Sequence, residues 1–198
     1  MKVHHLMGSA PYYTNCFLLT DNMGNAVLID CSIKWEKIEE ILKNDKAELK
    51  AILMTHGHHD HRECFDEVVK NSGAPVYMGR SDIAQFHLSD VCIEYKDKEA
   101  FEIGEMKIFA FHTPGHTQGS YCFKCEDMLF SGDTLFAGTV GRTDLPGGDF
   151  ETIMKSMRVI AEVIKNQNPK VMPGHAHFST FNIEKVQNPY LKEAIKCL

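Results

Sequence analysis

Long apolar runs are absent from this sequence of 198 residues. No stretch approaches the roughly 20 apolar residues that a membrane-spanning helix needs, and the N-terminal segment does not have the apolar core of a secretory signal. We therefore expect no membrane association, and we predict a cytoplasmic location.

Blocks of lysine and arginine are absent as well. The chain has 21 basic and 27 acidic residues, and its formal net charge is −6 at pH 7. Because a basic patch is the electrostatic requirement for binding nucleic acid or an anionic membrane, we expect neither as a partner.

A disulfide framework is also missing, since the seven cysteines are odd in number and scattered. This favours a reducing compartment. Cys122 and Cys125 have the spacing of a zinc or redox pair, but no second pair completes a four-cysteine site. Their segment, YCFKC, is typical of a strand, in which positions three apart point to opposite faces. We interpret both as structural, although the sequence leaves their role open.

Strand and helix patterns alternate along the chain, without repeats or linkers, and we predict a single domain over residues 1–198. Strands are predicted at 2–7, 16–20, 26–30, 50–55, 74–79, 106–116, 121–133 and 169–175. Helices are predicted at 35–45, with Ser32 as its cap, and at 63–73, 80–88, 149–166 and 188–198. The early run of strands favours an α/β (α+β) fold with two sheets and helices packed outside.

The segment THGHHDH, residues 55–61, concentrates histidines and an aspartate directly after a predicted strand. Three later loops, each also following a strand, end in metal-ligand residue types. The candidate ligands are His56, His58, Asp60, His61, His116, Asp133 and His175. Imidazole and carboxylate groups suit zinc, and also iron or manganese. Loops at one end of a strand scaffold can converge, so we predict a metal site.

The number of candidate ligands predicts two metal ions. His56 and His58, two apart in an extended segment, project the same way and can chelate one ion. Asp60 and His61, after a bend, can reach a second. Seven ligands exceed what one tetrahedral ion takes, whereas two ions sharing an aspartate and a water use them all.

These motifs resemble the metallo-β-lactamase superfamily. THGHHDH matches its T-H-x-H-x-D-H signature, and HTPGHTQGS, SGDTLF and PGH supply the remaining ligand motifs in order. GRTDLPGGD at 141–149 and NPYL at 188–191 are similar to the short bacterial glyoxalase II-like branch, also called hydroxyacylglutathione hydrolase-like. The resemblance implies an αββα sandwich with the metals in a cleft at the sheet edges.

The resemblance also implies how the ligands are divided. His56, His58 and His116 would hold one ion, Asp60, His61 and His175 the other, and Asp133 would bridge the two. Glyoxalase II proper has a C-terminal helical domain that helps to hold glutathione, which we do not expect here. PGHAH also replaces the common P-G-H-G. Both departures concern the substrate side, so we expect weak recognition of the thiol carrier.

The reaction expected from this site is hydrolysis of a small-molecule thioester of the S-lactoyl-glutathione type. A metal-bridging hydroxide would attack the carbonyl, with Asp60 as the catalytic residue that holds its proton. One alternative is a persulfide dioxygenase with one iron, which shares the GRTD segment. Another is a non-catalytic metal- or redox-binding protein that also uses Cys122 and Cys125.

Four further residues near the motifs are interpreted individually. We place His59 outside the ligand set and expect His112 to support the loop that carries His116. Arg142 is predicted either to pair with Asp144 or to contact substrate. His177 is either a solvated loop residue or part of the substrate mouth, so Arg142 and His177 are the candidate substrate-binding residues.

Overall fold

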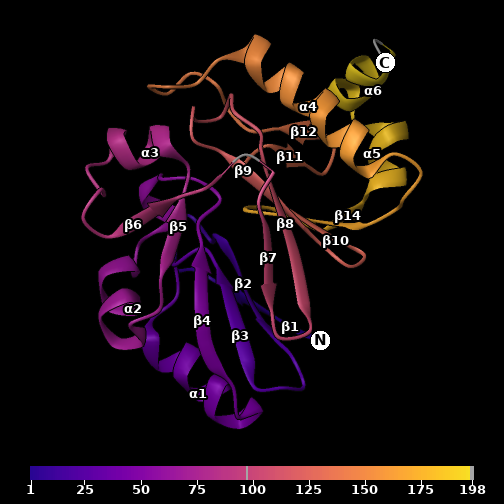
Figure 1. Ribbon diagram of the computed structural model, residues 1–198. Coiled ribbons are helices and arrows are strands. Elements are labelled where there is room, and N and C mark those ends of the chain that lie inside the picture. Colours follow the sequence, from indigo (N-terminus) through magenta and orange to yellow (C-terminus); the bar gives the residue numbers. More distant parts are fainter. Residues whose placement is uncertain (97, 197–198) are drawn as a thin grey trace.

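The computed structural model describes residues 1–96 and 98–196, and it consists of two six-stranded sheets with helices on both outer sides (Figure 1). This arrangement confirms the predicted αββα sandwich. The first sheet has the order β1-β2-β3-β4-β5-β6 and is antiparallel from β1 to β3 and parallel from β3 to β6. Its strands are β1 Lys2–Met7, β2 Asn15–Thr20, β3 Asn25–Ile29, β4 Glu48–Leu53, β5 Val76–Met78 and β6 Cys92–Glu94.

The second sheet has the order β14-β13-β10-β9-β8-β7, and only β10 and β13 pair in parallel in it. Its strands are β7 Ala100–Ile103, β8 Met106–His112, β9 Tyr121–Cys125, β10 Met128–Gly132, β13 Lys170–Pro173 and β14 Ser179–Thr180. A small two-stranded sheet is formed by β11 Leu135–Phe136 and β12 Thr139–Val140.

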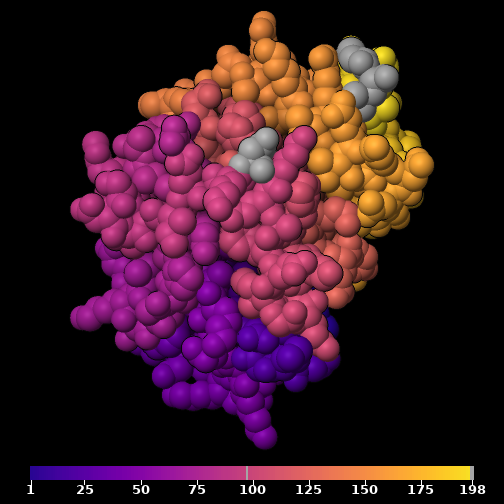
Figure 2. Space-filling model, viewed as in Figure 1, coloured from indigo at the N-terminus to yellow at the C-terminus, as the bar shows by residue number. Residues whose placement is uncertain are grey.

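The helices divide between the two outer faces. Those that pack on the first sheet are α1 Trp35–Asp45, α2 Phe65–Ser72 and α3 Arg80–Gln85. Those that pack on the second are α4 Phe150–Ile164, α5 Phe181–Gln187 and α6 Pro189–Lys196. A one-turn 3-10 helix, η1, covers His59–His61. In the space-filling view the N-terminal half forms the lower part of the molecule and α4 to α6 the upper part (Figure 2).

The apolar pattern of the strands explains the layers. In β2, Phe17 and Leu19 pack between the sheets, whereas Cys16 and Leu18 point to α1 and α2. Strands covered on both faces read as continuous apolar runs, because neither side is left to water. Ile153, Met157, Ile160 and Ile164 form the buried stripe of α4 that the sequence predicts. Three apolar layers thus hold the sheets and helices together.

Several sequence predictions are extended or corrected by the fold. The structure adds the strands β6, β7, β11, β12 and β14 and the helix α5 in segments where no regular element was predicted. The predicted strand at 121–133 is observed as two antiparallel strands, β9 and β10. The predicted helix at 188–198 is observed as Pro189–Lys196, and its last two positions lie outside the described residues. Ser32 does not cap α1, which begins after Lys34 without a side-chain cap. Its hydroxyl donates instead to the carbonyl oxygen of Asp60.

The structural interpretation of the cysteine pair agrees with the fold. Cys122 packs in the layer under α4, and Cys125 packs between the two sheets. Burial raises the pKa of the Cys122 thiol to about 12 and that of Cys125 to about 11. The two thiols therefore cannot join one site. Across the part of the chain that the structure describes, no helix has the length and apolar character that crossing a membrane requires.

Candidate metal centre

The predicted ligands come from four loops, each at the C-terminal end of a strand. His56 to His61 follow β4, His116 follows β8, Asp133 follows β10 and His175 follows β13. The structure brings all seven together in three overlapping groups, and within each group the potential ligand atoms lie within 4.8 Å of one another. Convergence of the loops, predicted from the strand pattern, is thus observed.

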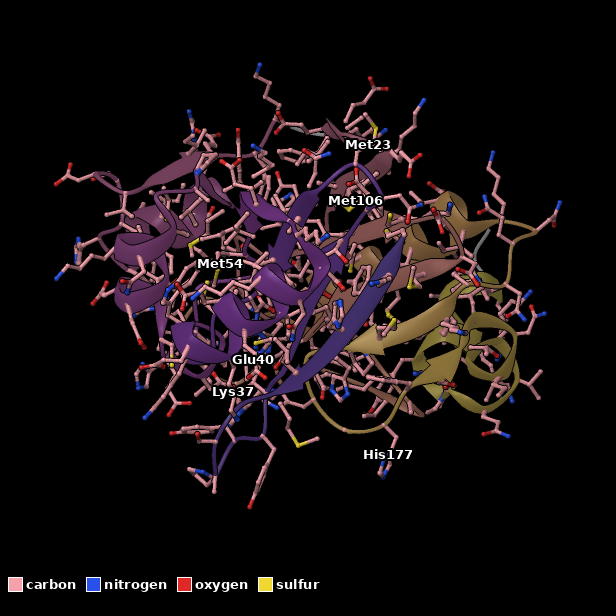
Figure 3. The ribbon with its side chains drawn as sticks, turned by 90° about the horizontal axis from the view of Figure 1, so that it is seen from below. Met23, Lys37, Glu40, Met54, Met106 and His177 are labelled. Atoms are coloured by element: carbon pink, nitrogen blue, oxygen red, sulfur yellow. The ribbon has the colours of Figure 1, made fainter. Side chains whose placement is uncertain are left out.

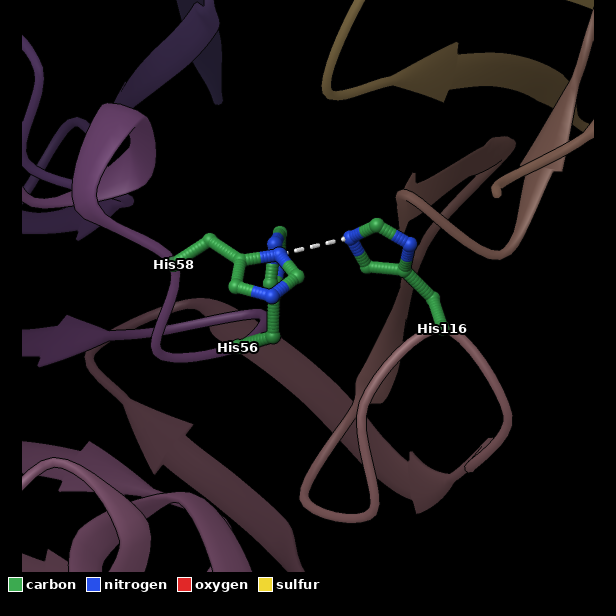
Figure 4. Close-up of side chains that lie close together, drawn as sticks. All are labelled: His56, His58 and His116. Carbon is green, nitrogen blue, oxygen red and sulfur yellow. Dashed lines mark hydrogen bonds between the residues drawn. The ribbon is translucent and has the colours of Figure 1, made fainter. Parts of the chain in front are cut away.

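The first group consists of His56, His58 and His116, whose rings converge in Figure 4. The Nδ1 atom of His58 lies 2.9 Å from Nε2 of His116. The planes of the three rings are nearly perpendicular in pairs, at 88°, 83° and 87°. This geometry directs three imidazole nitrogens to one point, which is what a cation in a histidine site needs.

The second group consists of Asp60, His61 and His175. The Nε2 atom of His175 lies 2.9 Å from Oδ2 of Asp60 and 3.3 Å from Nε2 of His61. Although burial alone would raise the pKa of Asp60, the hydrogen bond with His175 lowers it below its ordinary value. Asp60 is therefore a carboxylate at neutral pH, as a ligand or proton acceptor must be.

Asp133 lies between the two groups. Its Oδ1 atom is 3.2 Å from Nε2 of His61, and its Oδ2 atom is 3.5 Å from Nε2 of His116 and 3.6 Å from Nε2 of His175. Burial opposes its charge, but His61, His56 and His116 lower the pKa of this carboxyl far below its ordinary value. One carboxylate that faces both groups is the arrangement that a bridging ligand requires.

Two observations show that these residues fit divalent cations. Among the described residues, the Nε2 atom of His56 and the Oδ1 atom of Asp133 are buried side-chain atoms that make no hydrogen bond. Such atoms are costly to bury unless something else binds them. Burial also lowers the pKa of His56 far below its ordinary value and that of His58 to about 4. Both rings are therefore neutral and free to donate a lone pair.

The backbone leaves room for the side chains of the centre. A Cβ atom on Gly174 would lie 2.3 Å from Oδ1 of Asp133 and 2.4 Å from Cε1 of His61. No side chain tolerates such contacts. The glycine in the PGH motif is therefore required by the close approach of the β13 loop to the other ligands.

The ring nitrogens that face away from the centre are also held. Nδ1 of His61 hydrogen bonds with Oδ2 of Asp30 at 2.8 Å. Nδ1 of His116 donates to the carbonyl of Arg142 at 2.8 Å, and Nδ1 of His175 donates to the carbonyl of Tyr12 at 3.1 Å. Such bonds fix the ring orientation and the tautomer, which leaves Nε2 for a metal. Asp30 was missed in the sequence, although a polar residue ending the strand segment AVLID was a signal.

Asp82 is a second residue that sequence reasoning missed. Its fully buried carboxylate accepts hydrogen bonds from the amide of Gly57 at 2.7 Å, the hydroxyl of Thr117 at 2.8 Å and the amide of Gly119 at 2.8 Å. Gly57 belongs to the His56–His58 loop, and the other two donors follow His116 in its loop. Asp82 therefore ties together the loops that carry the first group. A lone aspartate in a short helix gives no sequence signal for this role.

A pocket of about 580 Å³ opens over the centre. His59 lies at this pocket but in none of the three ligand groups, which agrees with its exclusion from the ligand set. His112 hydrogen bonds with the carbonyl of Gln118 at 2.8 Å, which confirms its support of the His116 loop. Arg142 also lines the pocket. Its guanidinium forms two hydrogen bonds of 2.7 Å with Asp144, so the pair predicted as one alternative is observed.

His177 is exposed and points outward from its loop (Figure 3). It is not among the residues that line the pocket. Its prediction as a substrate contact therefore receives no support from the fold, and the alternative of a solvated loop residue fits its position.

Comparison with known proteins agrees with the fold and the site. Residues 10–175 match the family model of the metallo-beta-lactamase superfamily. The chain is 30% identical over 199 residues to the hydroxyacylglutathione hydrolase GloC of Haemophilus influenzae, across 91% of this chain and 93% of that protein. It is 32% identical over 179 residues to PksB of Bacillus subtilis, described as a probable polyketide biosynthesis zinc-dependent hydrolase, across 88% and 79% of the two chains.

Among solved structures, TTHA1623 in a di-iron-bound form superimposes with a TM-score of 0.80 at 27% identity, covering 95% of this chain and all of the other. The family model spans the ligand loops from the first to the last histidine of the centre. On this evidence, the chain belongs to the metallo-β-lactamase superfamily.

Proposed function

We propose that this protein is a metal-dependent hydrolase that cleaves small-molecule thioesters of the S-lactoyl-glutathione type at a dinuclear centre. The observation that carries the proposal is the pair of adjoining ligand groups with Asp133 between them. The similarity to GloC, a hydroxyacylglutathione hydrolase, supports the thioester class.

Two bound divalent cations, zinc in the first place and iron or manganese as alternatives, would supply a water-derived nucleophile near neutral pH and a Lewis acid for the carbonyl oxygen. His56, His58 and His116 would hold one cation, Asp60, His61 and His175 the other, and Asp133 both. Asp60 would also hold the proton of the attacking water, because it is ionised and lies at the pocket.

The remaining chemistry needs little from the protein. The pocket orients the thioester with its carbonyl over the centre, and a thiolate leaves without much help from a general acid. None of the described residues that line the pocket is a serine or cysteine. A covalent acyl-enzyme is therefore not part of the proposal.

Two other functions compete with this one. A persulfide dioxygenase would use a single iron, whereas seven candidate ligands in three overlapping groups are more than one ion takes and favour two ions. A non-catalytic metal or redox sensor using Cys122 and Cys125 is disfavoured, because the two thiols are buried in different layers and neither belongs to the ligand groups. A cytoplasmic enzyme acting on a small molecule remains the proposal.

The test combines elemental analysis of freshly purified protein with a panel of thioesters. We expect about two divalent ions per chain and metal-dependent hydrolysis of S-lactoyl-glutathione. With one acyl group and varied thiols, kcat/KM for glutathione should exceed that for smaller thiols by about tenfold or less, equivalent to about 1.4 kcal/mol. A single iron with oxygen consumption on a persulfide would replace this proposal with the dioxygenase. A thousandfold preference for glutathione would reveal a dedicated carrier site.

A further inference from the structure

The pocket over the metal centre has one apolar wall. Of the residues that line it, the apolar and aromatic ones other than histidine are Pro11, Tyr12, Phe136 and Leu145. They come from the loop before β2, from β11 and from the loop before α4. The ring of Phe136 lies edge-on to the His175 ring, with 6.3 Å between the centroids. The apolar wall therefore begins beside a candidate ligand of the metal centre.

The loop that carries Pro11 and Tyr12 is held in place by its own hydrogen bonds. The amide of Gly8 donates to the carbonyl of Thr14 at 2.8 Å, and the amide of Tyr13 donates to the carbonyl of Ser9 at 3.0 Å. The Tyr12 carbonyl in turn accepts a hydrogen bond from His175. This side of the wall is thus fixed relative to the metal centre.

The loop that carries Leu145 is anchored in a similar way. The amide of Gly148 donates to the Leu145 carbonyl at 2.8 Å. The side-chain amides of Gln85 and Gln118 donate to the carbonyls of Pro146 and Gly147 at 3.2 and 2.9 Å. Because both loops are already ordered, an apolar group can bind between them without a large ordering cost.

The permanent charges at the pocket do not favour an anionic acyl group. Arg142 is the one lysine or arginine among the described residues that line it. Its guanidinium is occupied by Asp144, which carries the opposite charge. The histidines and aspartates are directed at the metal centre instead. A free carboxylate at the far end of the acyl chain, away from the metal centre, would therefore lose water without gaining a partner.

We infer that the wall formed by Pro11, Tyr12, Phe136 and Leu145 selects thioesters with an apolar acyl group, such as a medium-length aliphatic or an aromatic acid. This inference rests on the proposed thioester hydrolysis and specifies its substrate class. The acyl end enters the pocket, because carrier thiols such as glutathione are larger and extend into solvent. Lactoyl thioesters are then accepted but are not preferred.

The experiment varies the acyl group on one small uncharged thiol, N-acetylcysteamine. The series comprises acetyl, lactoyl, hexanoyl and succinyl thioesters, assayed with the metal-loaded enzyme. We expect kcat/KM for hexanoyl to exceed that for acetyl by about tenfold or more, since burying each added methylene is favourable, and no gain for succinyl. Phe136→Ala and Leu145→Ala should reduce the hexanoyl-to-acetyl ratio to about threefold or less.

Val186→Ala is the matched control. Val186 is an exposed apolar residue on α5, with 69% of its surface accessible, and it is not among the residues that line the pocket. This variant should keep the ratio of the unmodified enzyme. An equal kcat/KM for acetyl and hexanoyl, a preference for succinyl, or a ratio that neither wall variant changes would overturn the inference.

A binding measurement separates this inference from the proposed function. Calorimetric titration of the metal-loaded protein with hexanoate, acetate and succinate requires no catalysis. Tighter binding of hexanoate that is lost in Leu145→Ala supports the apolar wall even if no thioester is hydrolysed, in which case the thioester function alone is wrong. Equal affinity for hexanoate and acetate overturns the wall, whatever the enzyme hydrolyses.

Discussion

Replacing Asp133 by asparagine tests the dinuclear centre most directly. The substitution keeps the shape of the side chain and removes its negative charge, which lies 3.2 Å from Nε2 of His61 and 3.5 Å from Nε2 of His116. Two unit charges about 4 Å apart interact by about 4 kcal/mol at an effective dielectric constant of about 20. Since 1.4 kcal/mol is a factor of ten, we expect kcat/KM to fall by about a thousandfold or more.

The readouts are metal content and thioester hydrolysis. Asp133→Asn should bind fewer than two ions per chain, because no carboxylate between the two ligand groups remains to offset the repulsion between the two cations. Asp90→Asn is the matched control, since it removes the same charge from an exposed aspartate that does not line the pocket. His59→Ala, outside the ligand groups, should also cost much less than Asp133→Asn.

One outcome would refute the bridging role of Asp133. If Asp133→Asn keeps two ions and loses no more kcat/KM than His59→Ala, the assignment of Asp133 as the bridging ligand is wrong. Far-ultraviolet circular dichroism of the purified variant distinguishes the expected loss of metal and activity from simple unfolding.

Three other perturbations give independent tests. Removing metal with a chelator should lower Tm, because ions that bind only the folded state stabilise it. His175→Ala should leave about one ion per chain by elemental analysis. Two ions in this variant would contradict the division of the ligands into two groups. Asp82→Ala should weaken metal binding about 10- to 100-fold in a chelator competition assay, because it frees the loops that Asp82 joins. The control is Asp90→Ala, which removes an exposed carboxylate and should leave metal binding unchanged. Burial alone would raise the pKa of Asp21, but hydrogen bonds from Asn25, Glu105 and Met23 lower it to about 2 from 3.8. A carboxyl group with a lowered pKa in the folded state stabilises the fold above pH 4, and this contribution disappears as the pH falls through 2. Asp21→Asn should therefore lower the free energy of unfolding by about 1 kcal/mol at pH 7 and by nothing measurable near pH 2. Urea unfolding at the two pH values measures the difference.

The long amphipathic elements could be read from the sequence because their patterns are local. The buried stripe of α4 and the apolar runs of β2 and β3 each reflect a face or a strand covered by its neighbours. The strands β6 and β14 are only three and two residues long, and their place in the sheets depends on pairing with β5 and β13. Pairing between distant segments leaves no periodicity to detect.

The sequence by itself determined the fold family and the candidate ligands. Imidazole and carboxylate groups gathered after strands, in motifs of fixed spacing, carry their chemistry in the residue types themselves. Ligand convergence followed from the strand scaffold, and the glycine of the PGH motif preserves the space that the ligands need.

Only the tertiary structure decided what surrounds these ligands. Asp82 and Asp30 act through hydrogen bonds to loops far away in the chain, Arg142 is engaged by Asp144, and His177 lies outside the pocket. The apolar wall likewise combines Tyr12 with Phe136 and Leu145, which are more than a hundred residues away in the chain. Substrate contacts are assembled from side chains on separate loops. Their meeting is fixed by how the two sheets pack, which no single stretch of sequence records.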